Sequence, residues 1–127
     1  MSVTDQTIEA EIQAKGLTAP RITPQDVQNI ITDEYYFTAE DGASQAMGWT
    51  NFAKIHTHKD AEPLRQITIC VLILKNGHKI VGVNTGPVSP ENFDAELARK
   101  LARENATDQI WPLLGFSLRS KLAGWLE

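Results

Sequence analysis

Apolar positions are densest between residues 66 and 83, where two runs rich in Val, Ile and Leu flank Asn76 and Gly77. Asn-Gly is the pair favoured in a two-residue hairpin turn, in which both central residues need a positive φ. The sequence therefore predicts a β-hairpin. The expected register pairs Lys75 with His78 and Ile73 with Ile80.

The first strand of this hairpin is apolar on both faces. One face carries Ile67, Ile69, Val71 and Ile73, and the other carries Cys70, Leu72 and Leu74. Such a strand has to be covered on both sides. Either helices cover both faces of the sheet, or another subunit does.

The C-terminal part of the chain has the period of amphipathic helices. Ser89 is a good N-cap and Pro90 suits a first helical position, so a long helix is expected to start there. Its core face would carry Phe93, Leu97 and Leu101. Thr107 is expected to start a short turn, and Pro112 to interrupt any continuous helix. A final amphipathic helix is indicated by Leu118, Leu122, Trp125 and Leu126.

The N-terminal half is less regular. Residues 1–20 are polar and predict a mobile arm or a loosely docked short helix. Thr23 and Pro24 then open a short helix, with an apolar stripe of Val27, Ile30 and Ile31. The aromatic run EYYFT favours a strand, AEDG after it favours a turn, and residues 43–64 predict a long loop or a weak helix.

Together these elements predict an α+β fold. An antiparallel sheet built on the central Asn-Gly hairpin would pack with the long helix after it and with the C-terminal amphipathic helix. The 127 residues, of which 42% are hydrophobic, suit a single domain over residues 21–127. Cys70, the single cysteine, is expected to be a buried free thiol, which is typical of a reducing cytoplasm.

Charge and hydropathy exclude several classes of partner. The net charge of −4 argues against a protein that coats duplex nucleic acid, because such proteins need a surplus of Lys and Arg. No apolar run approaches the ~20 residues that span a bilayer, and the polar N-terminus has no signal-peptide core. A small anionic ligand needs only a local cluster of cations and stays possible.

The best candidate site follows the hairpin. The backbone amides after Ser89 would be free to hold an anion at a helix start, and Gly82 and Gly86 would allow close approach of the loop to a ligand. The spacing of this loop by itself favours a plain connection with turn residues. On a helix from Pro90, one polar stripe would carry Asn92, Glu96, Arg99 and Arg103. Asn92 would bind a base or sugar and the arginines phosphate oxygens. The alternative is a solvated face on which Glu96 pairs with Lys100 and Arg99.

Signatures of catalysis are missing from the sequence. It has no P-loop, no dinucleotide fingerprint and no GxSxG, and adjacent carboxylates such as Asp33 and Glu34 would point apart. His56 and His58 share one face of an extended segment but have no further ligand nearby in the pattern, so a surface pair is the simpler interpretation. We expect no enzyme activity, no cofactor and no metal.

Three blocks of the chain carry a resemblance: RITPQDVQNIITDEYYFTAEDG, CVLILKNG, and SPENFDAELARKLARENATDQIWPLLGFSLRSKL. They resemble a family of small tailed-phage proteins catalogued without a function. The likeness covers residues 21–41 and 69–122.

The size of the chain, the hairpin followed by a helix, and the asparagine with arginines also resemble Thoeris anti-defence sponges. Phages use these proteins to sequester cyclic nucleotide immune signals. The resemblance implies self-association into dimers or larger assemblies in the host cytoplasm, pockets shared between subunits, and no chemical step. It implies that Asn92 binds the polar edge of the ligand and that Arg99, Arg103 and Arg119 bind phosphate. His78 would take the place of a stacking aromatic residue. The alternative is a phage accessory protein that binds and inhibits a host protein through the apolar hairpin or the last helix.

Overall fold

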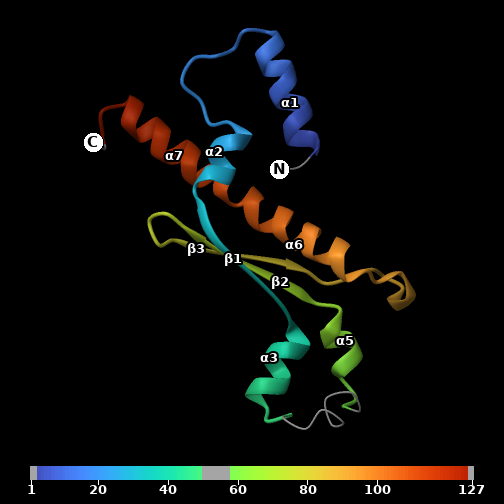
Figure 1. Cartoon of the computed structure of the whole chain (residues 1–127). Helices are drawn as coiled ribbons and strands as arrows, with labels where there is room; N and C mark the ends of the chain where they lie inside the picture. The colour runs from blue at the N-terminus through green and yellow to red at the C-terminus, as the bar shows by residue number, and fades with distance from the viewer. Residues whose placement is uncertain (1–2, 50–57, 126–127) are drawn as a thin grey trace.

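A three-stranded antiparallel sheet in the order β1-β2-β3 forms the centre of the computed structural model, which describes residues 3–49 and 58–125 (Figure 1). Helices lie along one face of the sheet and at its ends. The elements are α1 (Val3–Ala14), α2 (Pro24–Asn29), β1 (Ile31–Thr38), α3 (Ala39–Ala46), α5 (Ala61–Arg65), β2 (Thr68–Leu74), β3 (Lys79–Asn84), the 3-10 helix η1 (Pro90–Asn92), α6 (Ala95–Asp108) and α7 (Ile110–Leu122). The predicted α+β class, with its antiparallel sheet and long C-terminal helices, is confirmed.

The central hairpin is present, but its register differs by one residue from the expected one. Ile73 pairs with Lys79, and Ile80 pairs with Leu72. Because successive side chains of a strand point to opposite faces, this shift moves every side chain of β3 to the other face. Ile80 consequently lies in the core, where it is 4% exposed, and Lys79 lies on the opposite face.

The register differs because the turn holds three residues, 75–77, and not two. Leu74 N donates to His78 O at 2.9 Å, and Gly77 N donates to Leu74 O at 2.8 Å. Gly77 has a φ of +83°, whereas no described residue other than glycine has a positive φ. Asn76 therefore does not adopt the conformation that a two-residue Asn-Gly turn needs, and the loop is a type I turn followed by a left-handed glycine.

Helix α6 packs on the sheet through alanines and not through the predicted Phe93, Leu97 and Leu101. Leu97 and Leu101 are 53% and 40% exposed. The buried side chains of α6 at four-residue spacing are Ala98, Ala102 and Ala106. They face Gly82 of β3, at which an added Cβ would lie 2.6 Å from the Cβ of Ala106. Small residues on both elements let α6 approach β3 closely. Because this approach leaves no room for larger side chains, α6 turns its alanines toward the sheet and leaves Leu97 and Leu101 more exposed.

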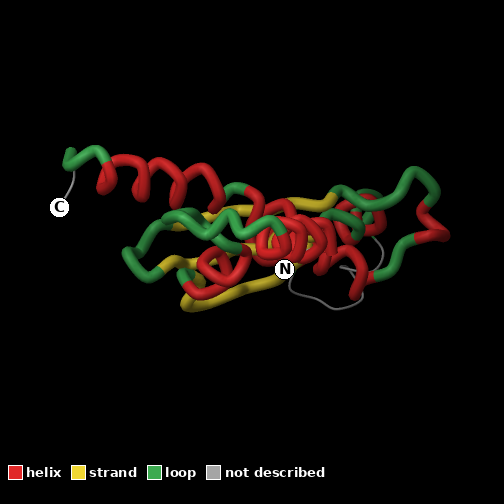
Figure 2. Tube along the Cα trace, turned by 90° about the horizontal axis from the view of Figure 1, so that it is seen from above, coloured by secondary structure: helices red, strands yellow, loops and turns green. Residues whose placement is uncertain are grey.

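The two C-terminal helices run nearly end to end, with a break at Gln109 (Figure 1). Thr107 does not start a new turn, because it lies buried inside α6. Pro112 lies in the first turn of α7, where a missing N–H is tolerated, so the interruption precedes this proline. Figure 2 shows the end of α7 projecting from the rest of the molecule. Its exposed apolar side chains are Leu113, Phe116, Leu122 and, just after the helix, Trp125.

Helices α2 and α3 each start at a side-chain cap. Thr23 caps α2 and forms a reciprocal capping box with Asp26, as the Thr-Pro pair indicated. A second capping box, between Thr38 and Asp41, starts α3 directly after β1. The predicted turn at AEDG is therefore wrong, because Thr-x-x-Asp is also a helix start. The predicted helical stripe extends two residues beyond α2, since Ile30 is the C-cap of the helix and Ile31 begins β1.

The remaining helices lie at the two ends of the sheet. Helix α1 has no buried residue, and α3 and α5 lie side by side at the opposite end (Figure 1). Arg65 of α5 binds Glu40 of α3 at 2.8 Å. The division into an arm over residues 1–20 and a domain over residues 21–127 stays a prediction.

One face of the sheet carries no described element. Residues paired across antiparallel strands point to the same side, so this face consists of three rows of three. The rows are Asp33–Ile73–Lys79, Tyr35–Val71–Val81 and Phe37–Ile69–Val83. We call these nine residues the open sheet face. Of the two predicted coverings, helices on both sides are not found among residues 3–49 and 58–125.

Candidate functional site

A cleft of about 380 Å³ lies between α2, the hairpin turn and α7. We call it the basic cleft. It is lined by Arg21, Ile22, Asp26, Asn29, Ile30, Lys75, Leu114, Ser117, Leu118 and Lys121. Its volume lies within the range of small-molecule sites, which are typically about 300–1,000 Å³.

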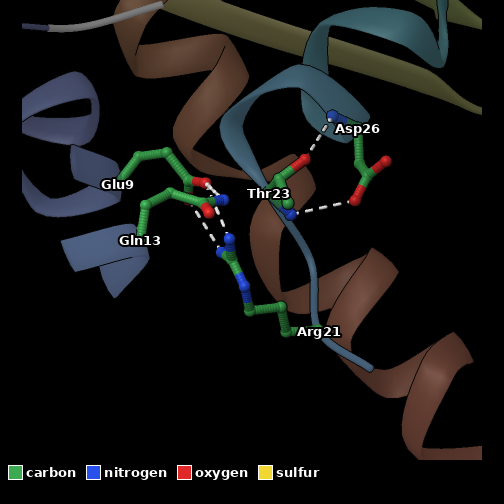
Figure 3. A network of polar contacts seen from close by, with 5 residues as sticks. All are labelled: Glu9, Gln13, Arg21, Thr23 and Asp26. Atoms are coloured by element: carbon green, nitrogen blue, oxygen red, sulfur yellow. Dashed lines mark hydrogen bonds and ion pairs between the residues drawn. The ribbon is translucent and has the colours of Figure 1, made fainter. Parts of the chain in front are cut away.

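Three segments far apart in the sequence meet at this cleft: α2 with the residues before it, the hairpin turn, and α7. Hydrogen bonds fix the start of α2 and join its end to the hairpin turn. The capping box that starts α2 consists of Asp26 N donating to Thr23 Oγ1 at 3.1 Å and Thr23 N donating to Asp26 Oδ2 at 2.9 Å (Figure 3). After the helix, Ile30 O accepts a hydrogen bond from Lys75 N at 2.9 Å. This bond fixes the start of the hairpin turn against the end of α2.

Arg21 lies at the edge of the cleft and also holds α1. Its Nη1 and Nη2 each donate to one carboxylate oxygen of Glu9, both at 2.7 Å, and Gln13 Nε2 donates to the same carboxylate at 2.9 Å (Figure 3). The hydrogen bonds from Arg21, followed by the one from Gln13, lower the pKa of Glu9 to about 2. Arg21 therefore closes one wall of the cleft, with most of its charge balanced by Glu9.

Lys75 and Lys121 supply the uncompensated charge of the basic cleft. Both are exposed, and neither forms an ion pair with another residue of the described part of the chain. The lining also contains one carboxylate, Asp26, whose charge is not cancelled by the hydrogen bond that it accepts from the neutral backbone N–H of Thr23. With Arg21 balanced by Glu9, the two lysines against Asp26 still leave the cleft with a net positive charge, although the chain as a whole carries −4.

Four of the lining residues are aliphatic: Ile22, Ile30, Leu114 and Leu118. Asn29 and Ser117 add uncharged polar groups to the lining. Ammonium groups bind anions such as phosphate, and an apolar surface accepts the flat face of a ring. The arrangement suits a ligand with both features.

The predicted site around Ser89 and Asn92 is built differently from the expectation. Ser89 and Pro90 start only the three-residue η1, and Ser89 makes no side-chain cap. Phe93 is extended, and α6 starts at Ala95 with Asp94 as its N-cap, whose carboxylate accepts Leu97 N at 2.9 Å. The helix start therefore already holds an anion, the Asp94 carboxylate, and Asn92 does not lie on one helical stripe with the arginines.

Arg103 is held by neighbouring side chains. Its Nε donates to Glu34 Oε1 at 2.7 Å and its Nη2 to Gln28 Oε1 at 2.7 Å, while Tyr36 Oη donates to Glu34 Oε1 at 2.9 Å. The hydrogen bond from Arg103 lowers the pKa of Glu34, and burial, then the bond to Glu34, raises the pKa of Tyr36. This network joins α2, β1 and α6, and it balances the charge of Arg103.

Burial also raises the pKa of the Cys70 thiol beside this network. Cys70 is fully buried, in agreement with its predicted role as a small hydrophobic residue. A thiol with a raised pKa is a poor nucleophile at neutral pH.

The other predicted ligand residues lie apart from one another. Arg99 is exposed on α6, where neighbouring Lys100 pairs with Glu96 at 3.5 Å, as the solvated-face alternative expected. His78 lies at the hairpin turn, at the opposite end of β3 from Asn92. Arg119 lines a shallow depression next to the basic cleft, with which it shares Leu118. The structure therefore does not bring Asn92, the arginines and His78 into one pocket, and their binding roles stay predictions.

Sequence reasoning missed the cations of the basic cleft. Arg21, Lys75 and Lys121 are separated by more than 40 residues each and share no local motif. The hydrogen bond between Lys75 and Ile30 shows what brings two of the segments together, and it involves only backbone atoms. No pattern of side chains in the sequence predicts this hydrogen bond.

The two histidines considered as a metal pair give no metal site in the described residues. His56 lies outside these residues. His58 stacks on Trp49 with ring centroids 3.8 Å apart, and its Nδ1 accepts Asp60 N at 3.1 Å. Across residues 3–49 and 58–125, no group of three or more His, Cys, Asp or Glu side chains is arranged to hold a metal ion. No helix in the same ranges is long and apolar enough to cross a membrane.

Comparison with known proteins gives one match. The family described as "Phage protein (N4 Gp49/phage Sf6 gene 66) family" matches residues 22–122, well over half of the chain. The chain belongs to this family. Membership in the N4 Gp49/Sf6 gene 66 family confirms the resemblance to small phage proteins. The matched range includes Lys75 and Lys121 of the basic cleft and begins one residue after Arg21. No curated protein and no solved structure matches the chain.

Proposed function

We propose that this member of the N4 Gp49/Sf6 gene 66 family binds a small anionic nucleotide without converting it, and that the basic cleft is the binding site. The observation that carries the proposal is the pair of lysines, Lys75 and Lys121, which have no ion-pair partner among the described residues and line the same cleft as four aliphatic side chains. The ammonium groups would bind phosphate oxygens, and the isoleucines and leucines would contact a base or ribose.

The basic cleft is a better site for an anion than the depression beside α6. That depression is lined by Val3, Leu97, Lys100, Leu101, Arg103, Glu104 and Thr107. Its cations are already paired, since Lys100 binds Glu96 and Arg103 binds Glu34. An anion would have to displace Glu34 from the partly buried Arg103, which offsets much of the gain from the new contact. The exposed pair of Lys100 and Glu96 is weakly held, so this depression offers one readily available cation. In the basic cleft, two lysines are available without such an exchange.

For a phage protein, the use of such binding would be sequestration of a cyclic nucleotide immune signal in the host cytoplasm. The protein would act by mass action, as an anti-defence sponge, and would need a dissociation constant on the order of 10 nM, or about −11 kcal/mol. Two or three charge-assisted hydrogen bonds and one apolar contact supply this if the cleft is preorganised. Arg119 lines a depression that shares Leu118 with the cleft, and it would extend the phosphate contacts of a larger ligand.

The test starts with the protein as it is purified from infected or signalling cells. The protein is denatured, the supernatant is analysed for nucleotides, and fresh protein is titrated calorimetrically with cyclic di- and trinucleotides and cyclic ADP-ribose isomers. We expect one of these to bind and to be recovered unchanged. No release, together with no binding at micromolar concentrations, refutes the proposal, and recovery of a converted nucleotide shows an enzyme instead.

Single-site variants then locate the ligand. Lys75→Ala and Lys121→Ala are each expected to weaken binding about tenfold or more. Lys59→Ala is the matched control, because Lys59 is exposed and lies outside the lining of the cleft. Arg103→Ala separates this site from the helix site predicted from the sequence. If Arg103→Ala alone abolishes binding and the cleft variants bind normally, the ligand lies beside α6.

A second candidate function is supported by the exposed apolar side of α7. Phe116 of α7 and Trp125, just after this helix, have ring centroids 6.0 Å apart and are 63% and 69% exposed. The end of α7 projects from the rest of the molecule (Figure 2). Such a surface suits a phage accessory protein that binds and inhibits a host protein. In that case the purified protein binds no nucleotide, and Phe116→Ser removes its effect in infected cells whereas Lys75→Ala does not.

A further inference from the structure

The open sheet face is the largest apolar surface of the sheet that no described element covers. Seven of its nine residues are hydrophobic, and only Asp33 and Lys79 are charged. Tyr35 and Phe37 of the edge strand β1 are 56% and 40% exposed. Val81 and Val83 of β3 are 51% and 41% exposed. Single exposed hydrophobic residues are ordinary, but these belong to adjacent rows on all three strands.

The size of this face is sufficient for an interface. Given the usual areas of such side chains, it exposes on the order of 500 Å² of apolar surface, which matches the ~300–600 Å² of the largest patch on a typical monomer, a patch that is often functional. Two such faces together bury on the order of 1,000 Å², about the least that a biological interface needs. A second copy of the chain therefore buries enough surface for a weak, concentration-dependent dimer.

The two charged residues make the face complementary to itself. Asp33 and Lys79 lie in the same row, at its two ends, with Ile73 between them. In one arrangement, two copies are related by a two-fold axis that lies between the two sheets and runs parallel to the strands. Each row then faces the same row of the other copy, and β1 faces β3 of the partner subunit. Asp33 consequently opposes Lys79 of the partner subunit, and the symmetry repeats this pair at the other end of the row.

The other in-plane two-fold axis, across the strands, gives a poor fit. In that arrangement β1 faces β1 and the order of the rows is reversed, so Asp33 opposes Phe37 of the partner subunit and Lys79 opposes Val83. Two charges per subunit are then placed against apolar side chains, which is costly. The positions of Asp33 and Lys79 thus distinguish the two arrangements.

We propose that two copies of this chain form a symmetric dimer through the open sheet face, with the two-fold axis along the strands and two intermolecular Asp33–Lys79 ion pairs. The two sheets pack face to face, about 10 Å apart, with Tyr35 against Val81 and Phe37 against Val83 of the partner subunit. The proposal is independent of the basic cleft, because no residue of the open sheet face lines that cleft.

The first experiment is sedimentation equilibrium of the full chain over a range of micromolar concentrations. We expect a monomer–dimer equilibrium for the wild type. Val81→Glu is expected to raise the dissociation constant of the dimer at least ~100-fold, because each dimer then buries two unpaired carboxylates. The control is Val88→Glu, since Val88 is fully exposed in a loop away from this face. Circular dichroism of both variants shows that the subunit stays folded.

The second experiment tests the symmetry through charge exchange. Asp33→Lys places like charges opposite each other in its homodimer, and so does Lys79→Asp, so each variant alone is expected to dimerise about tenfold or more weakly than the wild type. An equimolar mixture of the two variants restores both opposite-charge pairs across the interface. We therefore expect the mixture to form heterodimers with nearly wild-type affinity.

Three results overturn the proposal. A wild-type chain that is monomeric at all concentrations has no such dimer. A dimer that is unaffected by Val81→Glu forms through another surface, such as α7. A dimer that is weakened by Val81→Glu but not restored by mixing the charge variants uses the open sheet face with a different symmetry.

Discussion

Gly82 is the position at which the packing of α6 on the sheet can be tested most sharply. A methyl group added there would lie 2.6 Å from both N and Cβ of Ala106 and would collide with Ala102 O. Ala102 and Ala106 are fully buried, and two of the three contacted atoms belong to the backbone. A rotamer change cannot relieve the clash, so the helix has to move away from β3.

The magnitude follows from this geometry. Overpacking of a well-packed core costs about 1–3 kcal/mol, and a shift of a whole helix places Gly82→Ala at the upper end, about 3 kcal/mol. For a domain of this size, about 4 °C of Tm corresponds to 1 kcal/mol, so Tm should fall by about 12 °C. Urea unfolding followed by circular dichroism measures the free energy, and thermal unfolding measures Tm.

Gly42→Ala is the matched control for this substitution. Gly42 lies within α3, and an added Cβ there has no heavy atom within 4 Å. Because alanine is the better helix former, this change should stabilise by about 0.5–1 kcal/mol. If Gly82→Ala changes the free energy of unfolding by less than about 0.5 kcal/mol, the close approach of α6 to β3 is refuted.

Three further predictions concern the helices. Arg21 lowers the pKa of Glu9 to about 2, so the pair stabilises the docking of α1 fully above about pH 4.5 and progressively less as the pH falls toward 2. An NMR titration of Glu9 should therefore show a midpoint near 2. In Arg21→Ala this midpoint should move toward 4.5. A midpoint that Arg21→Ala leaves unchanged contradicts the assigned cause. Thr23→Ala removes the cap of α2 and should cost about 1 kcal/mol in urea unfolding, whereas a loss below ~0.3 kcal/mol would mean that the capping box is not formed in solution. Leu97→Ser should lower the free energy of unfolding by less than about 1 kcal/mol, because Leu97 is half-exposed. Ala102→Leu should lower it by more than about 2 kcal/mol, because Ala102 is fully buried. The reverse order would support the leucine stripe as the core face.

Local sequence signals predicted much of the fold. The Thr-Pro start of α2, the aromatic strand β1 and the hairpin each depend on interactions within a few residues, and the structure contains all three. The same local reasoning failed at the hairpin turn, where the sequence is compatible with either a two-residue or a three-residue loop. Asn76 and Gly77 suit a two-residue turn, but a three-residue loop places Ile80 under α6, and burial of that side chain decides the register.

Tertiary packing explains the errors at α6. Leucines at four-residue spacing are the usual core signal, and an alanine stripe of the same period lies beside them in the sequence. The alanines face the sheet because Gly82 of β3 leaves no room for larger side chains. This constraint involves two elements that are separated along the chain, so the helix sequence alone does not contain it.

The candidate site was the least predictable part. The expected site depended on a helix starting at Pro90, but Asp94 starts it instead. The cations of the basic cleft lie on three separate segments, which are brought together by the end of α2 and the hairpin turn. Arg103 was predicted to bind phosphate, and in the structure Glu34 and Gln28 accept its hydrogen bonds.

The most direct test of the central claim is the nucleotide affinity of the double variant Lys75→Ala/Lys121→Ala, measured calorimetrically with the nucleotide that the wild type retains. The comparison is Lys59→Ala/Lys15→Ala, which removes the same charge outside the cleft. We predict a loss of affinity of about 100-fold or more for the cleft variant, and a change within about twofold for the control. Equal affinity of the two double variants would contradict the assignment of the basic cleft as the binding site.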